Sequence, residues 1–132
     1  MFKIIKYDLG ICNYISIKRT MKLFTSLRNS LTIDEIWILE HYPVMTKGCK
    51  SINRDLLKNI YIPFPCIKTD RGGKTTYHAP GQLIVYLLMN IKNKNNNNFC
   101  FFKMENIMFM LLKKYNIKSQ CNIYKQGVFI EK

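Results

Sequence analysis

Apolar residues recur along the chain in two patterns, as short runs and as longer segments with helical spacing. Residues 2–7 alternate loosely between apolar and polar and predict a first strand, which Leu9-Gly10 closes. Residues 35–41 predict a strand with little polar face, which is typical of a central strand. Residues 82–89 form an apolar run that is too short to span a membrane and predicts a buried core strand.

Two segments have the apolar spacing of amphipathic helices. The first runs from Tyr14 through Ile17 and Met21 to Phe24, has basic residues between these positions, and follows Asn13, a candidate N-cap. We interpret it as a structural helix that covers the sheet. The second segment has an apolar stripe that we expect to pack in the core, formed by Phe101, Met104, Ile107, Met108, Leu111 and Tyr115.

The remaining segments predict short elements and turns. We expect a helical turn in residues 51–59, short strands at 65–69 and 75–77, an exposed Asn/Lys-rich loop at 92–98 and a last strand at 127–130. Some strands are joined by a turn and others by a helix, which predicts an α/β fold with a mixed sheet covered by helices. A length of 132 residues allows at most one domain, so residues 1–132 are predicted to form a single domain.

The net charge of +13 allows more than one interpretation. It is compatible with binding of nucleic acid or of an acidic partner by a non-catalytic basic module. Drift toward an A/T-rich base composition explains the same charge, because A/T-rich codons encode the abundant residues Ile, Lys, Asn, Phe and Tyr, and lysine is positively charged. No zinc-ligand spacing or RNA-binding aromatic motif accompanies the charge, so we do not expect a nucleic-acid partner.

The cysteines indicate a reducing compartment. Their number is odd, no pair has the C-x-x-C spacing of a metal site, and the first residues lack the apolar core of a signal peptide. We therefore expect reduced thiols, no metal site, no membrane association and a cytoplasmic location. The cysteines are Cys12, Cys49, Cys66, Cys100 and Cys121.

The most specific stretch of the chain is residues 70–82. Gly72 and Gly73 permit a tight loop that approaches a ligand closely, and a short β-favouring run follows them. Pro80-Gly81 is a turn signal that precedes the long apolar run. The stretch therefore predicts a loop, a short strand, a turn and a core strand, with polar side chains displayed on tightly held backbone.

Residues 71–82 resemble the signature of the octanoyltransferases of lipoate biosynthesis, which are relatives of the lipoate and biotin protein ligases. The shared pattern is Arg-Gly-Gly-x-x-Thr-Tyr-His-x-Pro-Gly-Gln followed by an apolar strand. The resemblance extends upstream through residues 34–48, where the family has a strand that ends in Glu-His-x-Pro-Val-x-Thr-x-Gly. Residues 127–130 resemble a later strand of the family, so the motifs occur in the same order over nearly the whole chain.

The resemblance implies the α/β fold of the biotin/lipoate protein ligase-like catalytic domain and an acyl-transfer activity. In that family a cysteine thiolate takes the octanoyl group from a carrier thioester and passes it to a lysine amine. The implied donor is octanoyl-acyl carrier protein. The implied acceptors are the lipoyl domains of 2-oxoacid dehydrogenases and the glycine cleavage H protein, and no metal, nucleotide or other cofactor is implied.

The resemblance assigns donor binding to the signature loop. Arg71 and Lys74 would donate hydrogen bonds, Tyr77 would supply an apolar wall and His78 a hydrogen-bonding edge. Backbone N–H groups at the glycines would approach the thioester. The predicted substrate-binding residues are Arg71, Gly72, Gly73, Lys74, Thr75, Thr76, Tyr77 and His78.

Two features depart from the family pattern. Ala79 stands where the family has glycine, and alanine would cost on the order of 1–2 kcal/mol if the backbone has a positive φ there. A residue before proline favours extended backbone, however, which alanine adopts freely. The catalytic lysine and cysteine of the family correspond to positions beyond Lys132, so we expect a truncated octanoyltransferase that holds the binding part without the nucleophile.

Two points stay open at this stage. A thioester-forming role for Cys49, Cys66 or Cys121 is conceivable, and we interpret these residues instead as packing residues. A fragment of a lipoate or biotin ligase is a second interpretation within the same fold. Such a fragment would need ATP and has different glycine-rich loops.

Overall fold

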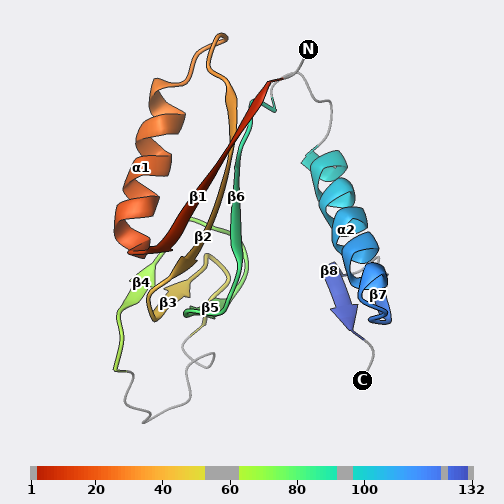
Figure 1. Cartoon of the computed structure of the whole chain (residues 1–132). Coiled ribbons are helices and arrows are strands. Elements are labelled where there is room, and N and C mark those ends of the chain that lie inside the picture. Colours follow the sequence, from red (N-terminus) through yellow and green to blue (C-terminus); the bar gives the residue numbers. More distant parts are fainter. Residues whose placement is uncertain (1–2, 53–62, 92–96, 123–124, 131–132) are drawn as a thin grey trace. The chain divides into compact units, whose positions relative to one another are not determined.

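The computed structural model describes residues 3–52, 63–91, 97–122 and 125–130. The chain forms two compact units, Met1–Met89 and Asn90–Lys132, and each is described by itself. In Figure 1 the first unit runs from red to green and the second is drawn in cyan to blue.

The larger sheet of the first unit contains strands β1 (Ile4–Cys12), β2 (Asp34–His41) and β6 (Ile84–Leu88) in the order β1-β2-β6. β2 is parallel to β1 and antiparallel to β6. The structure therefore confirms both the mixed sheet and the central position of the strand predicted at residues 35–41.

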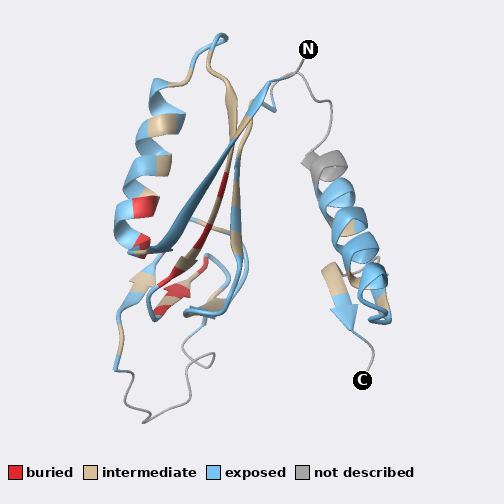
Figure 2. Ribbon diagram, in the orientation of Figure 1, coloured by how far each residue is buried: buried red, intermediate tan, exposed pale blue. Residues whose placement is uncertain are grey.

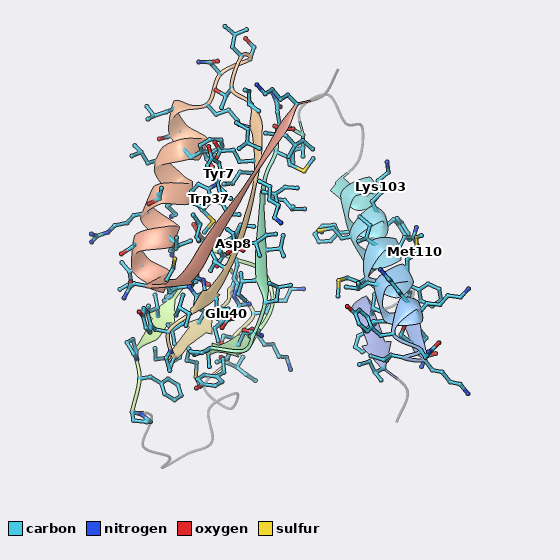
Figure 3. The ribbon with its side chains drawn as sticks, viewed as in Figure 1. Tyr7, Asp8, Trp37, Glu40, Lys103 and Met110 are labelled. Atoms are coloured by element: carbon cyan, nitrogen blue, oxygen red, sulfur yellow. The ribbon has the colours of Figure 1, made fainter. Side chains whose placement is uncertain are left out.

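Helix α1 (Tyr14–Leu27) covers one face of this sheet (Figure 1). The predicted N-cap is confirmed, because Asn13 Oδ1 accepts hydrogen bonds from the N–H groups of Ile15 and Ser16 at 2.9 and 3.3 Å. The core beneath the helix is formed by Ile17, Trp37 and Leu39, and Trp37 lies between the sheet and α1 in Figure 3. Buried residues gather on β2, at the start of α1 and in the small sheet described below (Figure 2).

Both outer strands differ from the prediction. β1 does not end at Leu9-Gly10 but continues to Cys12, because Gly10 takes a φ of +62° at an irregularity in the pairing with β2. β6 is an outer strand rather than a fully buried one. Ile84, Tyr86 and Leu88 face the core, while Val85 and Leu87 on the opposite side are exposed.

A second, small sheet carries the signature loop. It contains β3 (Val44–Lys47), β4 (Cys66–Lys68) and β5 (Thr75–His78) in the order β4-β3-β5. The strands predicted at 65–69 and 75–77 are confirmed as β4 and β5. β3 was not predicted as a separate strand: Pro43 ends β2 and β3 begins at the next residue. The helical turn predicted at 51–59 lies largely outside the described residues.

The second unit consists of helix α2 (Asn97–Lys114) and a hairpin of β7 (Ser119–Asn122) and β8 (Lys125–Ile130). The helix and last strand are confirmed, although α2 begins inside the predicted loop at 92–98 and β7 was not predicted. Within the second unit the predicted stripe on α2 is not buried, since all six of its residues are exposed. A hairpin of two short strands covers too little of the helix surface to bury them. No helix in the described part of the chain has both the length and the apolar character needed to cross a membrane.

Candidate ligand-binding site

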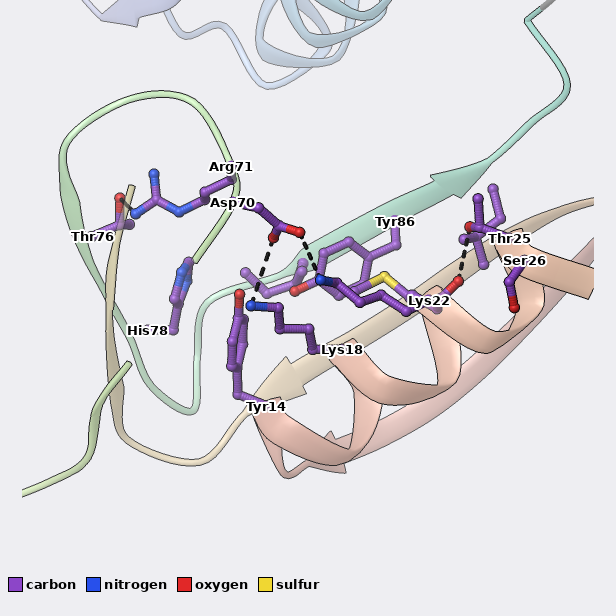
Figure 4. A pocket seen from close by; sticks show the side chains of 13 residues that line it. Tyr14, Lys18, Lys22, Thr25, Ser26, Asp70, Arg71, Thr76, His78 and Tyr86 are labelled. Atoms are coloured by element: carbon purple, nitrogen blue, oxygen red, sulfur yellow. Dashed lines mark hydrogen bonds and ion pairs between the residues drawn. The ribbon is translucent and has the colours of Figure 1, made fainter. Parts of the chain in front are cut away.

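A cavity of about 780 Å³ lies in the first unit between α1, β6 and the signature loop. Its volume is in the range of about 300–1,000 Å³ that is usual for small-molecule sites. Apolar side chains of Met21, Ile84 and Leu88 form part of its wall. Arg71, Thr76 and His78 lie toward one end and Thr25 and Ser26 toward the other (Figure 4).

Arg71 holds the polar end of the cavity together. Its Nη2 donates hydrogen bonds to the carbonyl and the hydroxyl of Thr46 and to the hydroxyl of Thr76, at 2.9, 2.8 and 2.8 Å. Its Nε also donates to Thr46 Oγ1 at 3.2 Å, and Nη1 donates to Gly72 O at 2.9 Å. These bonds leave one Nη1 N–H without a partner among the described residues. Arg71 is thus chiefly a brace between the loop, β3 and β5, with little capacity left for a ligand.

The glycines of the loop pack against the backbone that follows β3. The N–H groups of Gly48, Cys49 and Lys50 donate to the carbonyls of Lys74, Arg71 and Gly73 at 3.3, 2.9 and 3.0 Å. A Cβ on Gly48 would collide with the carbonyl oxygen of Gly73 and would stand 2.8 Å from that of Gly72. Gly48 therefore permits the close approach of these two backbone segments, and Gly73 supplies the positive φ of +83° that the loop requires.

The turn after β5 accommodates Ala79 without strain. The positive φ of +90° falls on Gly81, and Asn116 is the only non-glycine residue with positive φ in the described part of the chain. Gln82 N–H donates to Ala79 O at 3.1 Å, which gives a type II turn with proline and glycine in its central positions. The Glu40 carboxylate also accepts from Gly81 N–H at 2.7 Å and joins the turn to β2.

His41 is fully buried at the end of β2 and connects β1 to β6. Its Nδ1 lies 3.1 Å from Cys12 O, and its Nε2 lies 2.9 Å from the Tyr86 hydroxyl. A carbonyl can only accept, so Nδ1 carries the proton. Burial lowers the pKa of His41, which favours the neutral ring, and Nε2 then accepts from Tyr86 O–H. Burial also raises the pKa of Tyr86 to about 12, so its phenol stays protonated.

His78 and Tyr14 complete an aromatic cluster at the polar end of the cavity. The Tyr14 ring stacks on His78 with centroids 6.4 Å apart and meets His41 edge-on at 5.2 Å. His78 Nδ1 lies 2.7 Å from Gln82 Oε1, and its Nε2 lies 3.3 Å from Thr46 Oγ1. Burial raises the pKa of Tyr14, so both tyrosines present neutral hydroxyls.

The signature loop supplies only part of the cavity lining. Of the predicted substrate-binding residues, the structure brings Arg71, Thr76 and His78 to the cavity. Gly72, Gly73, Lys74, Thr75 and Tyr77 do not line it. Alternate residues of β5 point to opposite sides, so Tyr77 packs on Phe64 and Thr75 bonds to Ser51.

Helix α1 contributes residues to the site that were not predicted from the sequence. Tyr14, Lys18 and Lys22 line the cavity together with Met21. Their i, i+4, i+8 spacing places them on one side of the helix, next to the apolar stripe, and is the signal that could have identified them. Asp70 was part of the signature stretch but was not predicted as a site residue, and it also lines the cavity.

The described cysteines lie away from the cavity. Cys12 is half-buried and its Sγ lies 3.2 Å from Leu9 O, while Cys49, Cys66 and Cys121 are exposed. The interpretation of these last three as packing residues is therefore wrong. In the described ranges, no group of three or more His, Cys, Asp or Glu residues is placed to hold a metal ion.

Residues 14–132 match the family described as the lipoyl protein ligase A/B catalytic domain. An octanoyltransferase from Legionella pneumophila (strain Corby) is 39% identical over 125 residues, which are 94% of this chain and 62% of that protein. An octanoyltransferase from Nitrosomonas europaea is 39% identical over 132 residues, covering 99% of this chain and 64% of that protein. The chain thus spans somewhat less than two thirds of the length of these relatives.

A solved structure supports the fold. The crystal structure of P. falciparum LipL1 in complex with lipoate aligns with a TM-score of 0.59 and 14% sequence identity. The alignment covers 97% of this chain and 41% of that one. The lipoate ligase-like α/β fold is therefore confirmed.

The packing of Gly48 leads to a stability prediction. Gly48→Ala should lower the free energy of unfolding by about 1–3 kcal/mol, because the new methyl group forces two backbone segments apart. Gly72→Ala is the matched control, since a Cβ there has nothing within 4 Å, and should change stability by less than about 0.5 kcal/mol. Urea unfolding followed by circular dichroism measures both. Equal effects of the two substitutions would contradict this account of the loop.

The neutral His41 predicts a pH dependence of stability. Below its ordinary pKa of 6.5 the unfolded chain binds a proton that the buried ring resists. The contribution of His41 should therefore be complete above about pH 6.5 and should decline as the pH falls. Urea unfolding of the wild type and of His41→Gln at about pH 7.5 and 5.5 tests this. The variant should lose less stability between these pH values than the wild type, whereas a His78→Gln control should keep the decline.

Proposed function

The chain belongs to the lipoyl protein ligase A/B catalytic domain family, and from this premise we propose that its first unit binds the acyl group of octanoyl-acyl carrier protein. The reaction it serves would be transfer of octanoyl to a lysine of lipoyl domains, including those of 2-oxoacid dehydrogenases and the glycine cleavage H protein. We place this activity in the cytoplasm.

The observation that supports the proposal is the pairing of an apolar wall with a polar end in one cavity. Met21, Ile84 and Leu88 offer methyl and methylene contacts, and each buried methylene contributes about 0.8 kcal/mol. Several methylenes of an eight-carbon chain would thus supply several kcal/mol of binding. The thioester would then lie near Arg71, Thr76 and His78, whose positions are fixed by their hydrogen bonds.

The residues of the signature have two roles in this proposal. Thr76 and His78 contact the acyl donor directly, and Arg71 contributes to that contact only the one Nη1 N–H that its hydrogen bonds to the loop and strands leave. Gly72, Gly73, Lys74, Thr75 and Tyr77 act as the support that shapes the loop, through the backbone contacts with residues 48–50 and the packing on Phe64. The chemistry uses no nucleotide or metal, which separates it from a lipoate or biotin ligase that forms an adenylate.

Binding of octanoyl-pantetheine, a thioester without phosphate, tests the proposal by isothermal titration. Ile84→Ala removes part of the apolar wall and should weaken binding about tenfold, or about 1.4 kcal/mol, comparable to the loss of one or two buried methylenes. Val85→Ala is the matched control on the same strand, because Val85 points away from the cavity and is 47% exposed. It should leave affinity unchanged. If ATP with lipoate or biotin raises the thermal unfolding temperature of the protein and the octanoyl thioester does not, a fragment of a lipoate or biotin ligase is favoured instead.

The positions of the thiols give a second test. Because no described cysteine lines the cavity, the 132-residue polypeptide should form no octanoyl thioester when incubated with octanoyl-acyl carrier protein. Intact mass spectrometry measures the adduct, and alkylation by iodoacetamide verifies that exposed thiols are reactive. A stoichiometric octanoyl adduct on one cysteine would overturn this view of the site.

A further inference from the structure

Three charged side chains meet across the rim of the cavity. Asp70, at the start of the signature loop, lies with Oδ2 2.8 Å from Lys22 Nζ and with Oδ1 3.6 Å from Lys18 Nζ (Figure 4). The two lysines are one turn apart on α1, and all three residues line the cavity. A single carboxylate from one side thus bridges two ammonium groups from the other.

This arrangement is open to exchange with an outside anion. The Asp70 and Lys22 side chains are 67% and 62% exposed, and such exposed ion pairs contribute little to stability. The hydrogen bond from Lys22 is the main cause that lowers the pKa of Asp70 to about 2, so the carboxylate is ionised throughout the physiological range. Lys18 and Lys22 carry two positive charges and Asp70 one negative charge, so this part of the rim has a net positive charge.

We propose that Lys18 and Lys22 bind carboxylates on the acidic surface of the donor carrier protein, and that Asp70 occupies these lysines in the free protein and is displaced when the carrier docks. The inference rests on the proposed function, since it names the surface that receives the donor of that same site. Displacing Asp70 also removes a contact between α1 and the loop at the rim of the cavity, where the acyl chain would enter.

The carrier fits this rim by charge complementarity. An acidic partner brings several carboxylates, whereas Asp70 supplies one, so the exchange increases the number of ion pairs made by the two lysines. The chain as a whole carries +13, so it attracts an acidic carrier at long range. At short range, the two lysines at the rim form ion pairs with carboxylates of the carrier. Contacts of this kind set association rates and salt dependence more than they set the affinity for the acyl chain.

The test compares octanoyl-acyl carrier protein with octanoyl-pantetheine on the full chain. The double variant Lys18→Ala/Lys22→Ala should weaken carrier binding about tenfold at low salt and reduce its salt dependence. It should weaken octanoyl-pantetheine binding clearly less than carrier binding, because that ligand has no charge and loses only the contacts of the two lysine stems. Asp70→Asn should tighten carrier binding about threefold, because the competing carboxylate is gone. Circular dichroism and thermal unfolding verify that each variant is folded.

Arg19→Ala is the control on the same helix, because it removes one positive charge, against two in the lysine variant, at a position that does not line the cavity. It should change carrier affinity by less than about twofold. Equal losses for Arg19→Ala and the lysine variant would overturn the inference, as would weaker carrier binding by Asp70→Asn. The same lysine dependence with octanoyl-phosphopantetheine alone would assign the rim to the phosphate and would also overturn it. Failure of octanoyl-pantetheine to bind would instead refute the proposed function.

Discussion

The geometry of the site depends on the guanidinium of Arg71. It donates to the carbonyl and hydroxyl of Thr46, a residue that is fully buried, and to the hydroxyl of Thr76 on the neighbouring strand. Hydrogen bonds from a charged donor are stronger than neutral ones, and a buried threonine hydroxyl needs a partner. A lysine could not replace this contact, because a single ammonium group cannot reach several acceptors in one plane as the planar fork does.

The rest of the cavity is formed by the faces of β2 and β6 that point toward α1. Trp37, Leu39 and His41 of β2 and Ile84, Tyr86 and Leu88 of β6 alternate onto this face. The apolar members fill the space under the helix, and the His41–Tyr86 hydrogen bond joins the two strands at its polar end. Since both groups are neutral, the polar end gains order without placing an uncompensated charge in the core.

Local signals explain what could be predicted from the sequence. The Asn13 cap, the stripe of α1 and the Pro80-Gly81 turn depend on residues within a few positions of one another, and each was found as predicted. Three residues of the motif at 71–82, Arg71, Thr76 and His78, line the cavity that we describe as the candidate site. The fold and the family could therefore be predicted from local sequence signals and this motif.

The remaining features depend on contacts between distant parts of the chain. Arg71 directs most of its donors to Thr46, which lies 25 residues away, so a residue expected to donate to the ligand is mostly used as a brace. Asp70 pairs with Lys18 and Lys22 on a helix that local periodicity identified only as cover for the sheet. Likewise, whether Val85 or the stripe of α2 is buried depends on which element covers it, and residue spacing alone does not contain that information.

The type II turn after β5 has a consequence for how this signature tolerates change. All of its unusual backbone geometry is concentrated on Gly81, which also donates its N–H to Glu40, while Ala79 keeps an ordinary conformation. Position 79 is therefore under a weaker steric restriction than its neighbour two residues later. Alanine at position 79 therefore leaves intact the reversal of direction that delivers β6 to the cavity.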